Sequence, residues 1–393
     1  MPETQAIIGL PGFKIIKVTK SNPIIFEIKC DVVPLCPYCN GNECRIKDSF
    51  LRKLRHESFG VRVSRLEVRT HKFHCLSCKR YFNERLPGVL PYARATESFK
   101  KEVCKKHEQG IPQSTLQKDL FIGNATVERW YQKSVESKMR EFAGRPCPQV
   151  LGIDEHFFTR KQGYATTLVD LKTHRVFEVV LGRSEASLKG FLNKLTGRER
   201  VKVVVMDLSE TYRSIIKKYF PNAMIVADRF HVIRLVNHHF LKSWQQFDPN
   251  GRKNRGLLSL MRRHEWNLRE DQKQNLDRYL YQEYPVMGAI YEFKQKLCRF
   301  LLLKKVNHDQ VKRKYAGPFM TMLNELDDHP VEALRTLGKT LKSWLSEVVR
   351  MWRFTKTNSI TEGLHTKMEM ISRRAFGFRN FKNYRLRVLV LCS

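Results

Sequence analysis

The segment Val201-Lys-Val-Val-Val-Met-Asp207 is a run of apolar, mostly β-branched residues that ends in an aspartate. A short run of this composition is typical of a strand that is buried on both faces of a sheet. Ser209 can cap a helix over residues 210–220, and Pro221 ends that helix. The segment therefore predicts a strand and helix of an α/β sheet, with Asp207 at the carboxyl end of the strand.

The flanking segments extend this sheet. Runs rich in Val, Ile and Leu predict further strands, and two amphipathic stretches predict helices. The resulting order is three strands, helix, strand, helix, strand, helix, which is the order of a ribonuclease-H-like core. The strands are predicted over Val150–Asp154, Tyr164–Asp170, Val176–Leu181 and Ala223–Ala227, and the helices over Ser187–Leu195 and from Asp228 onward.

A long helical segment interrupts this core. The 133 residues between Asp228 and Glu362 are far too many for a loop. Apolar residues in 331–352 recur at spacings of three and four, as on one face of a helix. The fold class is therefore a multidomain α/β protein, with a core over 150–245 and 355–393 and an all-helical insertion over 246–354.

The N-terminal residues 1–92 predict short strands and contain two cysteine pairs, Cys36-Pro-Tyr-Cys39 and Cys75-Leu-Ser-Cys78. Two such pairs can supply four thiolates to one tetrahedral Zn²⁺, so we expect a zinc-ribbon-like DNA-binding domain. The gap of 35 residues is longer than the common ribbon spacing, although strands can fill it. Four buried thiols are the alternative, and the possible substitute ligands are Cys44, His71 and His74.

Residues 93–145 are predicted to be helical. Gln113–Leu120 followed by Asn124–Phe142 resembles a helix-turn-helix, and Arg129 and Lys133 on the second helix could contact DNA. A plain helical spacer is the alternative, because two amphipathic helices joined by a short turn are common.

The composition indicates a polyanionic partner. The chain of 393 residues has a formal net charge of +33, from 72 Lys and Arg against 39 Asp and Glu. Such an excess favours nucleic acid. No apolar run approaches the roughly 20 residues that cross a bilayer, and residues 1–12 lack the pattern of a signal peptide. We therefore expect a cytoplasmic, nucleoid-associated protein with no membrane partner.

Three carboxylates form the candidate active site. Asp154 and Asp207 follow predicted strands, and Glu362 lies near the start of a predicted helix. Carboxylates at the carboxyl edge of a sheet can share a pair of Mg²⁺ or Mn²⁺ ions, which is the arrangement for phosphodiester chemistry. Each aspartate alone could instead be a turn or a helix cap, and Glu362 a solvated charge. The competitors for metal contact are Asp228, a possible auxiliary ligand or a helix cap, and Glu155.

Basic residues follow Glu362 with aromatic residues between them. Arginines can track phosphates while aromatic rings stack on bases, although such rings pack equally well in a core. Trp266 and Trp344 could receive an unstacked base or be core residues. The predicted DNA contacts here are Arg373, Arg374, Arg379 and Arg385.

The sequence resembles the zinc-ribbon-bearing DDE transposases of bacterial insertion sequences, the ISL-three family, over nearly its whole length. The resemblance implies that Asp154, Asp207 and Glu362 are the catalytic triad, and that the protein binds terminal inverted repeats and target DNA as a homo-oligomer. His365 stands where the family pattern leads us to expect Asn. The matching blocks are CPYC (36–39), HCLSC (74–78), LGIDE (151–155), VVVMDLSETYR (203–213), FPNAMIVADRFHV (220–232) and the block from Thr357 to Leu389.

Three functions are therefore compatible with these features of the sequence. A transposase would use the carboxylates to cut DNA and then join it. A DNA-binding regulator would need only the N-terminal modules, and a ribonuclease-H-like nuclease would cut without joining. The presence of all three carboxylates together with recognition modules favours the transposase.

Overall fold

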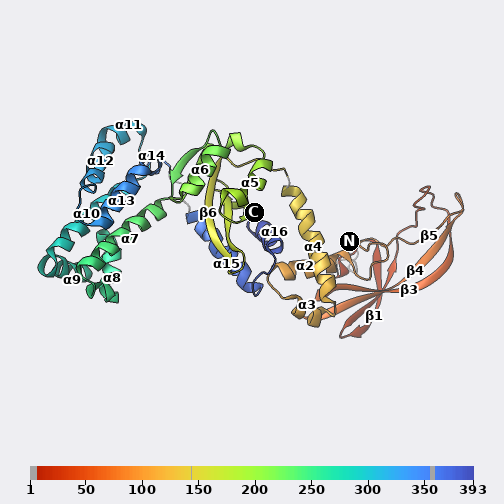
Figure 1. Cartoon of the computed structure of the whole chain (residues 1–393). Coiled ribbons are helices and arrows are strands. Elements are labelled where there is room, and N and C mark those ends of the chain that lie inside the picture. Colours follow the sequence, from red (N-terminus) through yellow and green to blue (C-terminus); the bar gives the residue numbers. More distant parts are fainter. Residues whose placement is uncertain (1–6, 143, 355–358) are drawn as a thin grey trace. The chain divides into compact units, whose positions relative to one another are not determined.

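The computed structural model describes residues 7–142, 144–354 and 359–393 (Figure 1). The predicted ranges also include 1–6, 143 and 355–358, which lie outside the described residues. The chain divides into two compact units. The first comprises residues 1–141 with 374–377, and the second comprises 142–373 with 378–393.

The first unit contains a strongly extended antiparallel hairpin. Its strands are β3 (Cys44–Phe59) and β4 (Arg62–Cys75), which pair along most of their length and turn at Gly60, where φ is +59°. The sheet order is β1-β2-β4-β3, with β5 (Tyr81–Asn83) paired to the far end of β4. β1 (Phe13–Ser21) and β2 (Ile24–Cys30) complete it. One face is apolar and buries Phe13, Phe26, Ile28, Leu54, Leu66 and Val68.

The helices of the first unit are α2 (Glu97–Glu108), α3 (Gln113–Leu120) and α4 (Asn124–Phe142). Thr96 caps α2, because its side chain accepts a hydrogen bond from the backbone N–H of Phe99. α3 and α4 have the predicted bounds. Their apolar faces share one core with α2, formed by Phe99, Val103, Leu116, Leu120, Ile122 and Val127.

The second unit is built on a mixed sheet with the strand order β10-β9-β6-β7-β8. The antiparallel strands are β6 (Val150–Thr159), β7 (Gly163–Asp170) and β8 (Arg175–Leu181). β9 (Val203–Met206) and β10 (Met224–Ala227) run parallel to β6. α5 (Glu185–Lys194), α6 (Glu210–Tyr219) and α7 (Arg229–Phe247) follow in the predicted order. Val203 to Met206 are all buried, as expected for a strand covered on both faces.

Between α7 and residue 354 the structure is helical. α10 and α13 pack against α7 (Figure 1). The apolar positions predicted from their spacing, such as Leu334, Leu337 and Leu341, are buried in a cluster that continues into the core beside the sheet. The helices are α8 (Arg255–Arg262), α9 (Glu270–Asp277), α10 (Pro285–Leu301), α11 (His308–Gln310), α12 (Ala316–Glu325), α13 (Glu332–Ser343) and α14 (Leu345–Arg350), with short 3₁₀ and π turns between them.

The chain ends in α15 (Ser359–Arg374) and α16 (Phe381–Cys392). α16 packs against β8 within the second unit. Among the described residues, none of the helices combines the length and apolar character needed to cross a membrane.

Candidate active site

Three aspartates stand side by side at the carboxyl edge of the parallel strands. Ile153 of β6 and Ala227 of β10 are both paired with Met206 of β9. The next residue after each of these is an aspartate: Asp154, Asp207 and Asp228. Because the strands run in the same direction, the register brings the three carboxylates to the same end of the sheet.

Asp207 has an unsatisfied carboxylate oxygen. Its Oδ1 is buried and has no hydrogen-bond partner among the described residues. Burial raises the pKa of Asp207, and the nearby Glu155 and Asp228 carboxylates raise it further. A buried oxygen without a donor carries a large desolvation cost, which a bound cation can offset. This oxygen therefore fits a divalent metal ligand.

The charged form of the Asp154 carboxylate is also destabilised by its surroundings. Burial raises its pKa to about 6, and the neighbouring Asp207 and Asp228 carboxylates act in the same direction. Its Oδ1 accepts a hydrogen bond of 2.8 Å from the backbone N–H of Glu155. The site thus concentrates negative charge in a poorly solvated place, as expected for a cation site.

Asp228 interacts with the first turn of the helix that follows it. It caps α7, accepting a hydrogen bond from the backbone N–H of His231, and its Oδ2 lies 2.7 Å from His231 Nδ1. This contact is the main cause that raises the pKa of His231. The cap alternative therefore describes Asp228 in this structure, and its contact favours the protonated form of His231 beside Asp154 and Asp207.

Glu362 lies in the first turn of α15 and is exposed. One turn later, Nδ1 of His365 is 3.9 Å from Asp154 Oδ2. Residues three apart share a helix face, so Glu362 lies on the face of α15 that approaches Asp154. In the described part of the chain, the three predicted carboxylates do not form a group with ligand atoms within 4.8 Å of one another; the four cysteines do.

A chain of hydrogen bonds, not predicted from the sequence, supports this face of α15. Thr167 Oγ1 is 3.0 Å from His365 Nε2 and 3.0 Å from His156 Nδ1. His156 Nε2 is in turn 2.9 Å from the Tyr384 hydroxyl. Burial lowers the pKa of His156 to about 3 and that of His365 to about 4, so both rings are neutral at neutral pH. One signal was present: His156 follows Asp154 by two residues, which puts both on one face of the strand.

The four predicted cysteines converge in the first unit. The Sγ atoms of Cys36 and Cys78 are 3.5 Å apart, those of Cys39 and Cys75 are 3.6 Å apart, and all four lie within 4.8 Å of one another. Four sulfurs about 2.3 Å from a tetrahedral Zn²⁺ would be about 3.8 Å apart. The cluster therefore fits one structural zinc ion. Backbone hydrogen bonds, chiefly from Cys78, lower the pKa of Cys75 to about 6, which favours the thiolate.

The substitute ligands lie elsewhere. His71 Nδ1 is hydrogen-bonded with the Ser49 hydroxyl at 2.8 Å, and the His74 ring packs on Tyr81 with centroids 4.7 Å apart. Cys44 packs near the cluster but is not part of the four-sulfur group of described residues.

Most of the predicted DNA-contacting side chains are exposed. They are Arg129, Lys133, Arg373, Arg374 and Arg379. Arg385 differs, because its guanidinium forms a two-pronged ion pair with Glu178 of β8. That pair attaches α16 to the sheet and occupies the side chain within the fold.

The aromatic residues divide between core and surface. Phe381 and Tyr384 pack around Phe158, whereas Phe376 is 88% exposed. Trp344 is buried beneath the Arg213 guanidinium, so the core alternative holds for it. Trp266 is 46% exposed and stacks on His264.

Comparison with known proteins identifies related sequences. The model of a transposase family, the ISL-three DDE transposases, matches residues 151–388. The chain is 25% identical over 369 residues to the transposase for insertion sequence element IS1001 of Bordetella parapertussis, covering 91% of this chain and 88% of that protein. It is 21% identical over 321 residues to an uncharacterized 48.3 kDa protein of insertion element ISM1 from Methanobrevibacter smithii, covering 76% of this chain and 73% of that one.

Proposed function

Because this chain belongs to the ISL-three family of DDE transposases, we propose that it cleaves DNA at the ends of an insertion sequence and joins those ends to target DNA. The observation that carries the proposal is the alignment of Asp154 and Asp207 on neighbouring parallel strands, with a buried Asp207 oxygen that lacks a partner among the described residues. A structural role for these aspartates would not require such a costly arrangement.

The fold proposed for this chemistry is the ribonuclease-H-like core over 150–245 and 355–393, interrupted by the helical insertion over 246–354. The strand order with β6 at the centre, two antiparallel strands on one side and two parallel strands on the other, supports it. Residues 1–92 are proposed as the zinc-ribbon DNA-binding domain and 93–145 as the helix-turn-helix domain.

Asp154, Asp207 and Glu362 are the proposed catalytic residues and would hold Mg²⁺ or Mn²⁺. When bound, two such ions activate the attacking oxygen and stabilise the leaving oxygen in a phosphodiester displacement. The strands hold the two aspartates rigidly, whereas Glu362 is exposed on α15, and α15 would have to bring it to the two aspartates when the metal binds. Asp228 is proposed as an auxiliary residue that keeps the His231 charge beside the carboxylates.

The proposed substrates are the terminal inverted repeats of the element and the target DNA. The net charge of +33 and the exposed Arg129, Lys133, Arg373, Arg374 and Arg379 suit phosphate contacts. Two element ends must meet for joining, so a homo-oligomer on DNA is proposed, associated with the nucleoid.

The test uses labelled DNA carrying the ends of the element, whose inverted repeats are found by sequencing around the gene. With Mg²⁺ we expect the wild-type protein to cut and join. Asp207→Ala and Glu362→Gln should bind the same DNA and do neither. Glu369→Gln is the matched control for Glu362→Gln, because Glu369 is an exposed glutamate on the same helix.

The result separates the three functions. Cleavage without joining would indicate a nuclease, and binding without cleavage by the wild type would indicate a regulator. Equal cleavage by Asp207→Ala would remove the carboxylate assignment.

A further inference from the structure

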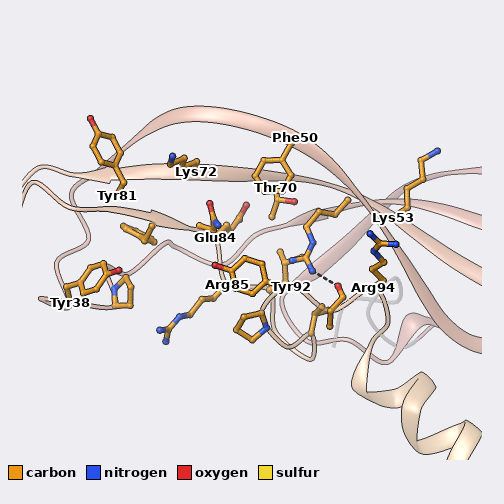
Figure 2. Close-up of a pocket in the computed structure, with 18 residues that line it drawn as sticks. Tyr38, Phe50, Lys53, Thr70, Lys72, Tyr81, Glu84, Arg85, Tyr92 and Arg94 are labelled. Carbon is orange, nitrogen blue, oxygen red and sulfur yellow. Dashed lines mark hydrogen bonds between the residues drawn. The ribbon is translucent and has the colours of Figure 1, made fainter. Parts of the chain in front are cut away.

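A groove in the first unit has no role in the chemistry above. Its volume is about 1260 Å³. That exceeds the roughly 300–1,000 Å³ of typical small-molecule pockets, so the groove suits a segment of a polymer. β3, β4 and β5 form one wall, and the segment from Glu84 to Arg94 forms the other (Figure 2).

The groove is strongly basic. Arg52, Lys72, Arg85 and Arg94 line it with positive side chains; the Lys53 side chain lies on the opposite face of β3, paired with Glu67 at 3.3 Å, and Glu84 is the one acidic group among the lining residues that the structure describes. The Glu84 carboxylate accepts a hydrogen bond of 2.9 Å from the backbone N–H of His71, and the basic side chains of the lining outnumber this one carboxylate. The net charge of the lining therefore favours an anionic occupant.

Exposed aromatic rings accompany these charges. Tyr92 is 89% exposed, Tyr38 is 57% exposed and Tyr81 is 51% exposed, and Phe50 on β3 is 41% exposed (Figure 2). Exposed aromatic rings gathered in one groove and rimmed by polar side chains indicate an interaction site, whereas scattered single rings would not. Phosphates of a duplex would need only the charges, whereas unpaired bases can stack on the rings.

A buried polar atom also lacks a partner here. Thr70 lines the groove opposite Phe50 in the β3–β4 register, is 1% exposed, and its Oγ1 has no hydrogen-bond partner among the described residues. Burying a hydroxyl without a partner is costly, and a polar atom of an occupant could satisfy it.

Two features fix the positions of the groove walls: the cysteine cluster beside Tyr38 and a hydrogen bond between the two walls. Tyr38 lies between the zinc-cluster residues Cys36 and Cys39, and Arg52 donates a hydrogen bond of 2.6 Å to the carbonyl oxygen of Ala93. A site held this way is ordered before it binds, which lowers the entropic cost of binding.

We propose that this groove binds single-stranded DNA, with its arginines and lysines on the phosphates and Tyr92, Phe50, Tyr81 and Tyr38 stacked on unpaired bases. The proposal goes beyond the strand-cleavage chemistry and does not depend on it, because binding is measured without divalent metal in the assay buffer.

The experiment measures the affinity of the full-length, zinc-loaded protein for a labelled 20-residue oligothymidylate by fluorescence anisotropy. We expect Tyr92→Ala and Phe50→Ala each to weaken binding about tenfold, since stacking contributes roughly 1–3 kcal/mol per base. Leu51→Ala is the matched control, because Leu51 is 53% exposed on the same strand but lies on the opposite face from Phe50. Its affinity should equal that of the wild type.

Two further DNA ligands distinguish contacts to bases from contacts to phosphates. A 20-base-pair duplex of unrelated sequence and an abasic deoxyribose-phosphate oligomer should bind Tyr92→Ala as well as they bind the wild type. If Tyr92→Ala loses as much affinity for the abasic oligomer as for oligothymidylate, the proposal is overturned in favour of a surface that contacts phosphates alone. Unchanged binding of oligothymidylate by both aromatic variants would overturn it outright.

Photocrosslinking locates the strand directly. An oligothymidylate with 5-iodouracil should crosslink to the groove tyrosines or Phe50, as mapped by mass spectrometry. Crosslinks confined to other parts of the chain would contradict the proposal. Zinc content and thermal unfolding are compared with the wild type for every variant. If Phe50→Ala misfolds, Tyr92→Ala alone tests the proposal, because Tyr92 is almost fully exposed and its substitution should not disturb the fold.

Discussion

His365 Nε2 and Thr167 Oγ1 are 3.0 Å apart, although the two residues are 198 positions apart in the chain. This hydrogen bond joins α15 to β7, whose Thr167 is paired with Asp154 of β6. It therefore places the helix that carries Glu362 against the strand that carries Asp154. The same threonine is hydrogen-bonded with His156, so one hydroxyl contacts two partly buried rings.

Thr167→Val should lower the rate of strand cleavage on the order of 10–100-fold, because α15 loses its hydrogen bond to β7 beside Asp154 and Glu362 shifts with the helix. The valine has the same shape but cannot bond either histidine. Cleavage rates at saturating DNA and the free energy of unfolding are both measured.

Thr166→Val is the control for this change. Thr166 is equally buried, and its hydroxyl donates to the carbonyl oxygen of Gly182 and is hydrogen-bonded with Tyr212. Both variants should lose stability of roughly 1–3 kcal/mol, from unsatisfied partners. Only Thr167→Val should slow cleavage; equal slowing by the two variants would show a general loss of stability.

Asp154→Asn should stabilise the protein at neutral pH when no Mg²⁺ is added. Burial raises the pKa of Asp154 from 3.8 to about 6 in the folded protein. Between pH 4 and 6 the folded state holds a proton that the unfolded state has released, so stability falls as pH rises through this window. Above pH 6 the variant should be more stable on the order of 2–3 kcal/mol, and the difference should vanish near pH 4.

Denaturant unfolding at several pH values checks this, with zinc retained and chelators omitted. The pKa values of about 3 for His156 and about 4 for His365 lie at or below this window, whereas His231 interacts with Asp154, so its titration contributes to the difference. Added Mg²⁺ should stabilise the wild type more than the variant. If the stability difference between Asp154→Asn and the wild type is the same at every pH, burial does not raise the pKa of Asp154.

Cys75→Ser should abolish zinc binding and unfold the N-terminal sheet. Zinc binding contributes roughly 10–16 kcal/mol in zinc-finger peptides, which rivals the roughly 5–15 kcal/mol stability of a whole domain. Metal analysis and circular dichroism measure the two effects. Cys44→Ser is the control, because Cys44 packs beside the cluster without belonging to it; a variant at Cys75 with full zinc content would rule out the site.

Glu347→Ala should destabilise the second unit by about 3–5 kcal/mol, as breaking a buried ion pair does. Glu347 on α14 is 3% exposed and accepts two hydrogen bonds of 3.0 Å from Arg213 on α6. Glu210→Ala is the control, because Glu210 also pairs with Arg213, but its side chain is 67% exposed and should contribute about 0–1 kcal/mol. Similar losses from the two variants, measured by denaturant unfolding, would contradict the distinction between buried and exposed pairs.

Local patterns predicted elements well where one kind of residue dominates a segment. Val203–Met206 is uniformly apolar and forms a buried strand, and the two CxxC pairs converge on one centre. β3 was missed, because its 16 residues are rich in charge and half of them are exposed. Strands of that kind show no apolar run, and β3 is stabilised by its pairing with β4 in the same hairpin.

The sequence by itself determined which cysteines can share a metal and that Asp207 follows a strand, and its total charge predicts a polyanionic partner. The prediction that a strand ends at Asp154 was wrong, because β6 continues to Thr159 through its pairing with β7. Only the tertiary structure decided that Asp228 pairs with His231, that Arg385 pairs with Glu178, and that Thr167 joins His365 to His156. The groove beside Tyr92 likewise appears only once β3, β4 and the following segment are packed. The physical reason is that side-chain contacts depend on how the backbone elements pack, and residue type and spacing alone do not specify that packing.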